Sequence, residues 1–514
     1  MSHSVAGKSE RSIAAVAAAT VLSRMAGLLR DSVLFALLGL SEWNGAFLFA
    51  FTVPNLFRRM LGEGALNSAM IPLFAGTLKS HSQDEAFTFL NRLLSRLCAF
   101  LLFAIGACAV AFLLCHRFFS DRWLRALGLS LLLAPYLLFT CLSAMICGAL
   151  NALGFFGLPA LATLPLNGFM VATGVGALLL CPSNKLLATL LVCGGVLAGG
   201  MGQLAFPSLL LRRRGWRFRW DWSHHPLLDR LWNLFLPAVL GAAMVQINAT
   251  VSRLLAFWLT ANGISTLYLS SRLVELPLGV FAISIISVSF PDLAQSASTG
   301  DGGAFARGYG RALRSVLMVT IPSAIGLILL SRPILTALFG WGNYGADDLA
   351  RTLPVLRASA VGIPLFAMAG LSTRAFHALQ DMKTPVRAAA VAILANLLLT
   401  LLLIKPFGAV GIAVANALSA GFQCVLLQRK IGRLGKRPAG AGRPLLWANG
   451  VLLAFLLAFV RLPFARPPGR SGALLQLAIA IPSAIALYGL VLWRSGFGEI
   501  SLLWAPLGLL RRKK

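Results

Sequence analysis

Seven arginines stand inside long apolar runs of this 514-residue chain, where a charged side chain is costly. An arginine at the centre of a membrane-spanning helix costs about 2.5 to 3.5 kcal/mol on insertion scales. We therefore expect these side chains to face water, to have partners or to reach the membrane surface. They are Arg24, Arg30, Arg58, Arg59, Arg253, Arg272 and Arg357.

The chemistry that embedded guanidinium groups suit is the binding of phosphate. Each group presents a planar fork of N–H donors that grips two phosphate oxygens at once. Only three acids accompany the seven arginines inside apolar runs, namely Asp31, Glu63 and Glu275. A structural network of ion pairs is the alternative interpretation, but such a network would be closer to charge balance. The excess of positive charge favours a water-filled cavity that attracts an anion.

Depth and spacing separate these arginines. At 1.5 Å per residue, Arg24 lies about 18 Å into its run, Arg58 about 20 Å and Arg272 about 12 Å. Arg253 and Arg357 lie nearer the ends of theirs, where reaching the membrane surface explains them. We therefore take the three deep arginines as the core of an anion site.

Two of the embedded acids follow an arginine at helical spacing. Glu63 comes four residues after Arg59, and Glu275 comes three residues after Arg272. Residues three or four apart share one face of a helix. Each pair should therefore lie side by side.

The elements that position these residues are membrane-spanning helices. The chain is 58% hydrophobic and 12% charged, and its mean hydropathy is +0.81, which no water-soluble globular protein approaches. Its apolar residues form unbroken runs such as 186–211, not the alternating ten-residue segments of an outer-membrane barrel. This excludes a soluble enzyme with an anchor and predicts an all-α polytopic membrane protein.

Polar, glycine and proline clusters divide the apolar runs into about fourteen transmembrane helices. Kinks are expected at Pro54 and Pro277, because proline removes a hydrogen bond inside a helix. The spans are 12–38, 45–75, 87–115, 124–150, 158–180, 186–211, 233–260, 264–291, 309–330, 349–373, 385–404, 408–428, 444–464 and 472–493.

The formal charge of +29 would suggest nucleic acid in a soluble protein, but here topology explains it. With fourteen spans and a cytoplasmic amino terminus, the basic residues gather in loops on one side of the membrane. The positive-inside rule makes that side cytoplasmic and places both termini there. Three basic segments, 212–219, 429–443 and 511–514, should then lie against anionic membrane lipids, with no nucleic-acid partner.

Weak internal repeats indicate a duplication. SAMIPLFAGTLKS (68–80) resembles SVSFPDLAQSAS (287–298), and ALNALGFFGLP (149–159) resembles ALQDMKTP (378–385). Because each half has an even number of helices, the two halves should share one orientation. The predicted domains are a six-helix bundle in 1–220, a second in 221–440, and two appended helices with a basic tail in 441–514.

Several kinds of site are missing from the sequence. It has no Walker GxxxxGK[ST] motif, no HExxH, no cluster of histidines or carboxylates, and no CxxC among its eight cysteines. We therefore expect no cofactor, no metal site and no enzymatic activity. Any uphill work would draw on an ion gradient, the membrane potential or consumption of the product.

Five stretches carry a resemblance to a known family. They are SRMAGLLRD (23–31), VPNLFRRMLGEGALNSAMIP (53–72), ALNALGFFGLPA (149–160), SRLVELPLGVFAISI (271–285) and LQDMKTPV (379–386). In this order they resemble the MurJ (MviN) lipid II flippases of the multidrug/oligosaccharidyl-lipid/polysaccharide exporter superfamily. The resemblance covers nearly the whole chain, including the number of spans.

The resemblance implies a function in peptidoglycan biosynthesis and cell shape. Such a flippase moves the undecaprenyl-diphosphate-linked disaccharide-pentapeptide from the cytoplasmic to the periplasmic leaflet of the bacterial inner membrane, by alternating access around a central cationic cavity. The last two spans would hold the lipid tail. The substrate-binding arginines implied are Arg24, Arg30, Arg58 and Arg272, with supporting or gating residues Arg59, Glu63, Glu275, Ser23 and Asn55.

Two positions depart from the family pattern. Asn44 and Ser271 stand where many members carry an acid, so any role of those acids in gating or coupling does not transfer. Coupling to a proton or a monovalent cation stays open. Asn396 and Thr400 are candidates for a cation site, although packing between helices explains such polar residues more often.

Three alternatives remain beside a lipid II flippase. A flippase for another polyprenyl-diphosphate-linked glycan would use the same arginines, so only the motifs separate the two. A drug or cation antiporter of the same superfamily would need buried carboxylates, which the positive interior disfavours. A membrane transferase or phosphatase would need a catalytic cluster, and the sequence shows none.

Overall fold

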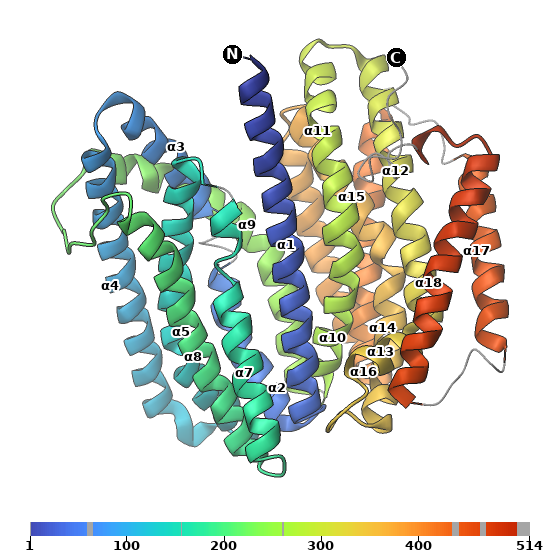
Figure 1. Ribbon diagram of the computed structural model, residues 1–514, viewed down its shortest axis with the longest axis horizontal. Helices are drawn as coiled ribbons and strands as arrows, with labels where there is room; N and C mark the ends of the chain where they lie inside the picture. The colour runs from blue at the N-terminus through green and yellow to red at the C-terminus, as the bar shows by residue number, and fades with distance from the viewer. Residues whose placement is uncertain are drawn as a thin grey trace. The chain divides into compact units, whose positions relative to one another are not determined.

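The computed structural model describes six stretches of the chain. Within them every regular element is a helix, and ten helical segments are long and apolar enough to cross a membrane. The described residues are 2–58, 65–155, 157–259, 262–433, 442–462 and 469–500. The fold is therefore all-helical and polytopic, in line with the class expected from the sequence (Figure 1).

The chain divides into two compact units, and the first contains residues 1–257 with 342–344. It begins with a long helix that a tight turn at Gly39 separates from the next. Its helices are α1 (Ser2–Leu38), α2 (Glu42–Phe57), α3 (Ala65–Ser80), α4 (Gln83–Cys115), α5 (Asp121–Ala152), α6 (Gly157–Ala160), α7 (Leu164–Leu180), α8 (Lys185–Arg212) and α9 (Pro226–Leu259), whose last two residues belong to the second unit.

The second unit contains residues 258–341 and 345–514. A π-helical turn over Leu278–Ala282 joins its first two helices into one segment. Its helices are α10 (Gly263–Pro277), α11 (Ile283–Ser298), α12 (Gly302–Leu329), α13 (Ser331–Phe339), α14 (Ala346–Val361), α15 (Ile363–Ala378), α16 (Lys383–Arg433), α17 (Arg443–Arg461) and α18 (Gly469–Arg494).

Small residues let the helices of the first unit pack closely. Helix α8 lies against α7 and α5 along a face that contains Gly199 and Gly200. A Cβ atom added at Gly199 would approach the backbone of Leu166 to 2.7 Å, and one at Gly200 would approach the ring of Tyr136 to 2.6 Å. Close backbone approach through small residues is the usual way in which membrane helices associate.

The predicted break between two spans near residue 408 is confirmed. Helix α16 contains non-helical backbone at Gly408, with φ 55° and ψ −131°, a conformation that glycine adopts without a steric penalty. Its 50-residue apolar segment, Lys383–Gly432, would measure about 75 Å as one helix. Since a bilayer core is about 30 Å thick, this segment is long enough to cross twice.

The helices also depart from regular geometry next to the two prolines where kinks are expected. Pro277 is followed at once by the π-helical turn, and Arg58, four residues after Pro54, is itself in a π-helical turn. Proline has no N–H to donate, so the regular i to i−4 ladder is interrupted there.

The two connections that resemble each other in sequence share one backbone conformation. Gly154 has φ 88° and Gln380, the one non-glycine residue with positive φ in the described chain, has φ 59°. The residue after each donates its N–H to the carbonyl five positions earlier, at 2.9 and 3.0 Å. Both helices therefore end in the same left-handed cap. The domain boundaries expected from the sequence stay predictions.

Candidate functional site

Arg30 lies in a buried ion pair in the first unit. Its side chain is 9% exposed, and its Nε and Nη2 atoms donate to Asp31 Oδ1 at 3.0 and 2.6 Å. Nη1 donates to Asn167 Oδ1 on α7 at 3.2 Å, and the guanidinium carbon lies 5.8 Å from the centre of the Phe51 ring on α2. This arginine therefore ties α1 to two other helices besides carrying charge.

Ser23 holds the turn of α1 that carries Arg24. Its hydroxyl lies 2.7 Å from the hydroxyl of Thr163, the residue before α7. Arg24 is the next residue along α1, and it is half-buried. Because Ser23 fixes α1 against the start of α7 at this level, the structure gives it a positioning contact beside the predicted binding residue.

Asn55 contacts the guanidinium group of Arg58. The Arg58 Nε atom donates to Asn55 Oδ1 at 3.4 Å, and Asn55 Nδ2 donates to the Phe51 carbonyl at 2.9 Å. One side chain thus bridges the helix backbone and the arginine at the carboxyl end of α2. The expected pair of Arg59 and Glu63 lies outside the described residues.

The predicted pairing of Arg272 with Glu275 is confirmed. The Nη1 atom of Arg272 lies 3.7 Å from Glu275 Oε2, and both side chains lie on the last turns of α10. The side chains remain 29% and 41% exposed in this structure. The contact is longer than the Arg30 pair, so this guanidinium is held less tightly by its neighbour on the helix.

Two other positions singled out in the sequence have defined contacts. The Nε atom of Arg357 donates to the hydroxyl of Ser331 at 3.0 Å, which gives this arginine a partner within the second unit. Asn44 is fully buried, and its amide donates to the Gly39 carbonyl, which closes the turn between α1 and α2. Asn44 thus has a structural contact of its own in this turn.

The structure places Arg24, Arg30 and Arg58 in the first unit and Arg272 in the second. All four are donors only, and each offers a charge and N–H groups that suit a phosphate ester. Among the described residues there is no group of three or more histidine, cysteine or acidic side chains that could hold a metal ion. The guanidinium groups themselves suit the binding of an anion.

Some contacts had no signal in the sequence. Asn167 and Thr163 stand 137 and 140 residues from Arg30 and Ser23, so nothing local points to them. Asp31 follows Arg30 directly, and adjacent residues on a helix do not normally face each other. The flexible arginine side chain nevertheless folds back onto the neighbouring carboxylate.

The sequence matches one family over most of its length. The model of the family described as "Lipid II flippase MurJ" matches residues 34–465. A probable lipid II flippase MurJ of Haemophilus influenzae is 32% identical over 438 residues, which cover 80% of this chain and 84% of that protein. One of Rhizobium meliloti is 28% identical, and the match covers 96% of this chain and 95% of that protein.

Solved structures show the same fold. A lipid II flippase MurJ in an inward closed conformation superposes with a TM-score of 0.77 at 23% identity, covering 93% of this chain and 99% of that chain. An inward-facing multidrug resistance MATE transporter of the MOP superfamily gives 0.64 at 14% identity, covering 82% and 100%.

Proposed function

Because the chain belongs to the MurJ family of lipid II flippases, we propose that it moves lipid II, the lipid-linked peptidoglycan precursor, across the membrane. It is a multi-pass membrane transporter, not an enzyme. The direction is from the cytoplasmic to the periplasmic leaflet of the bacterial inner membrane, with both termini in the cytoplasm. The match of residues 34–465 to the family carries this proposal.

The full architecture proposed is fourteen spans. Ten of them are the segments identified by length and composition. The other four are a second crossing by α16, one crossing each by α1 and α9, and one crossing formed by α2 and α3 together. The proposed domains are six-helix bundles in 1–220 and 221–440, which enclose a cationic cavity, with 441–514 appended. In this proposal α17 and α18 receive the polyprenyl tail.

The proposed roles of the arginines follow from charge. Arg24, Arg58 and Arg272 bind the diphosphate, while Ser23 and Asn55 position the first two. At an effective dielectric near 20, one unit charge pair 4 Å apart is worth about 4 kcal/mol. Several such contacts offset much of the dehydration of a diphosphate, which the hydrocarbon core alone would not accept.

Arg30 has two roles in this proposal. Its predicted contact with substrate is kept, but its bonds to Asp31 and Asn167 also stabilise the first unit. Glu275 keeps Arg272 oriented, and Arg59 and Glu63 are proposed to support the same site. Alternating access exposes these groups first to the cytoplasm and then to the periplasm.

The direct test is accessibility of labelled lipid II in vesicles that contain the purified protein. We expect headgroups to become accessible from the opposite side with the wild type, and this to fall with R24A, R58A and R272A. The control is R311A, which removes an exposed arginine from α12. Unchanged transport in all three variants would refute the proposed site.

A second arm separates lipid II from other diphosphate-linked glycans. An unrelated polyprenyl-diphosphate glycan is added in excess as competitor. Because its diphosphate would satisfy the same arginines, equal competition would favour a flippase of broader substrate range. Absence of competition, together with rescue of cells depleted of their lipid II flippase, would support the narrower function.

A further inference from the structure

Residues 213–225 join α8 to α9 as an extended segment along α4, here called the strap (Figure 1). Its carbonyl oxygens accept hydrogen bonds from three side chains that succeed one another along α4: Gln83 at 2.6 Å, Asn91 at 2.9 Å and Arg96 at 3.0 Å. The accepting carbonyls belong to Arg214, Arg217 and Trp222. The strap therefore runs parallel to α4 and follows it for several turns.

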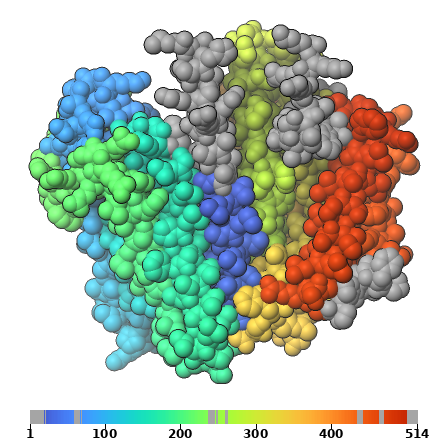
Figure 2. All heavy atoms as spheres, in the orientation of Figure 1, coloured from blue at the N-terminus to red at the C-terminus, as the bar shows by residue number. Residues whose placement is uncertain are grey.

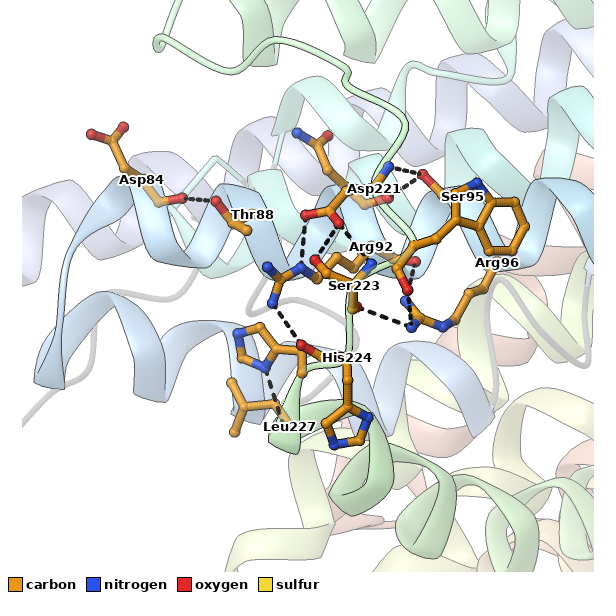
Figure 3. A network of polar contacts seen from close by, with 12 residues as sticks. Asp84, Thr88, Arg92, Ser95, Arg96, Asp221, Ser223, His224 and Leu227 are labelled. Atoms are coloured by element: carbon orange, nitrogen blue, oxygen red, sulfur yellow. Dashed lines mark hydrogen bonds and ion pairs between the residues drawn. The ribbon is translucent and has the colours of Figure 1, made fainter.

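An ion pair fixes the carboxyl-terminal end of the strap. Arg92 Nε donates to Asp221 Oδ2 at 2.7 Å, and its Nη1 donates to the His224 carbonyl at 3.1 Å. The Asp221 N–H in turn donates to Ser95 Oγ at 3.2 Å, as Figure 3 shows. These contacts hold the strap on α4 through backbone and side chain together.

The depth of this end follows from the sequence of α4. Arg96 is the last charged residue of the helix, and residues 97–115 carry no charge. At 1.5 Å per residue those nineteen residues span about 28 Å, close to the thickness of a bilayer core. The end of the strap that is bonded to Arg96 therefore lies where the hydrocarbon begins.

Aromatic residues alternate along the strap, and three of them remain exposed while Trp216 is buried. Phe218 lies 5.5 Å from Trp220 between ring centres, and Trp220 stacks on Trp222 at 6.1 Å with 7° between the ring planes. Their exposed fractions are 44%, 55% and 58%. Side chains of this green part of the chain lie at the surface of the first unit in Figure 2. Amphipathic aromatic rings at that depth are typical of a membrane–water interface.

The same segment is strongly basic. Four arginines of the strap are exposed, and its one acid, Asp221, is already paired with Arg92. Arg96 donates to carbonyl groups of Arg92, Trp222 and Ser223. The exposed charge is therefore positive, which complements a negatively charged surface. The exposed arginines are Arg213, Arg214, Arg217 and Arg219.

We propose that the strap binds anionic phospholipid headgroups in the cytoplasmic leaflet, with Phe218, Trp220 and Trp222 inserted among the headgroups. Its arginines contact lipid phosphates, and its bonds to α4 fix the depth at which α9 enters the membrane. The inference rests on the cytoplasmic orientation proposed above but not on flipping. A soluble protein partner on this surface is the alternative that the test must detect.

The test measures the depth of the strap in full-length protein. Spin labels are placed on W222C or R213C, in a background where the exposed Cys108 and Cys115 are replaced by alanine. The protein is reconstituted in nanodiscs of phosphatidylcholine with or without phosphatidylglycerol. With phosphatidylglycerol, the spin label at 222 should collide more often with oxygen, which concentrates in the membrane, than with a water-soluble nickel complex. The label at 213 should collide more often with the nickel complex than with oxygen. Equal nickel access at both positions in both lipids would overturn the proposal and favour a soluble partner.

Charge variants test the lipid preference. R217Q/R219Q should abolish the effect of phosphatidylglycerol on the label at 222. R307Q/R311Q removes two exposed arginines from α12 and should leave that effect intact. Specific recognition of the anionic headgroup is refuted if R217Q/R219Q retains the whole effect of phosphatidylglycerol. It is also refuted if R307Q/R311Q loses that effect to the same extent as R217Q/R219Q.

Two further readouts separate this inference from the proposed function. A membrane-impermeant maleimide added outside intact cells should not label R213C, and labelling would overturn the orientation and the inference with it. Lipid II accessibility is measured on the same W222C protein. A shielded label in a protein that does not flip lipid II would support the strap and count against the proposed function alone.

Discussion

Arg30 in the first unit and Arg272 in the second both lie near a carboxylate on their own helix, but in different ways. The Arg30 pair is buried, with donor distances of 3.0 and 2.6 Å, and a second helix contributes Asn167. The Arg272 pair is 3.7 Å apart and remains partly exposed in its unit. A buried charge must be compensated by the fold itself, whereas an exposed one can exchange water for a ligand.

These two environments indicate which arginine to expect in which role. A guanidinium group that donates most of its hydrogen bonds inside the protein contributes mainly to the stability of the folded state. One whose contact with its own helix is longer and more exposed can exchange that contact for a phosphate.

Replacing Arg30 by alanine should give the largest effect. It leaves the fully buried Asp31 without its ion pair to Arg30, a change that typically costs about 3 to 5 kcal/mol. The measurement is thermal unfolding of the purified protein. R30M/D31N, which removes both charges, should recover much of the loss. A wild-type Tm for R30A with transport abolished would instead make Arg30 a binding residue only.

Replacing Arg272 by alanine should impair substrate binding more than stability. Loss of one hydrogen bond to a charged group costs about 1.5 to 3 kcal/mol, or roughly ten- to a hundredfold in affinity. Lipid II binding and Tm are measured on the same preparation. R272K should be intermediate, since lysine keeps the charge but not the planar fork. A fall in Tm as large as that of R30A would remove the contrast.

Replacing Ser23 by alanine should have a smaller effect, of about 1 kcal/mol on unfolding, because one hydrogen bond to Thr163 is lost. T163A should cost a similar amount, and the double variant little more than either single one. Additive costs in this cycle would show that the contact does not couple α1 to α7.

The smallest effect concerns the strap, outside the membrane-spanning segments. Hydrogen bonds from Ser223 and Arg92 hold the pKa of Asp221 well below its usual range, so this carboxylate stays charged at physiological pH. Its stabilising contribution is present above the usual pKa of about 3.9 and is lost only as the pH falls through the lowered value. Spin-label accessibility at 222 should therefore not respond to Asp221 above pH 5.

His225 gives a second expectation at the same place, in a higher pH range. Burial, and then the charge of Arg92, lower its pKa below 6.5, and its Nδ1 accepts the Leu227 N–H at 3.2 Å. The neutral form is favoured in the folded state, so this contribution is complete above pH 6.5 and declines as the pH falls toward the lowered pKa. Hydrogen exchange of residues 222–228 should rise slightly at pH 5.5, and H225F should remove that rise.

The class of the protein and most of its helices could be predicted because apolar length and period are local properties of the sequence. Three further features depend only on neighbours along the chain. They are the break at Gly408, the irregular helical turns after Pro54 and Pro277, and the pairing of Glu275 with Arg272. The motif resemblance likewise pointed to the family that the comparisons establish. Composition, spacing and short motifs along the chain were sufficient for these features.

The contacts that distinguish one arginine from another were decided by tertiary structure. Asn167 and Thr163 approach α1 only because α7 packs on it, and Asp221 meets Arg92 only because the strap follows α4. A sequence specifies how many charges lie within apolar runs. Which neutral side chains complete their contacts depends on residues more than a hundred positions away, since packing, not proximity along the chain, sets the distance between a donor and its acceptor.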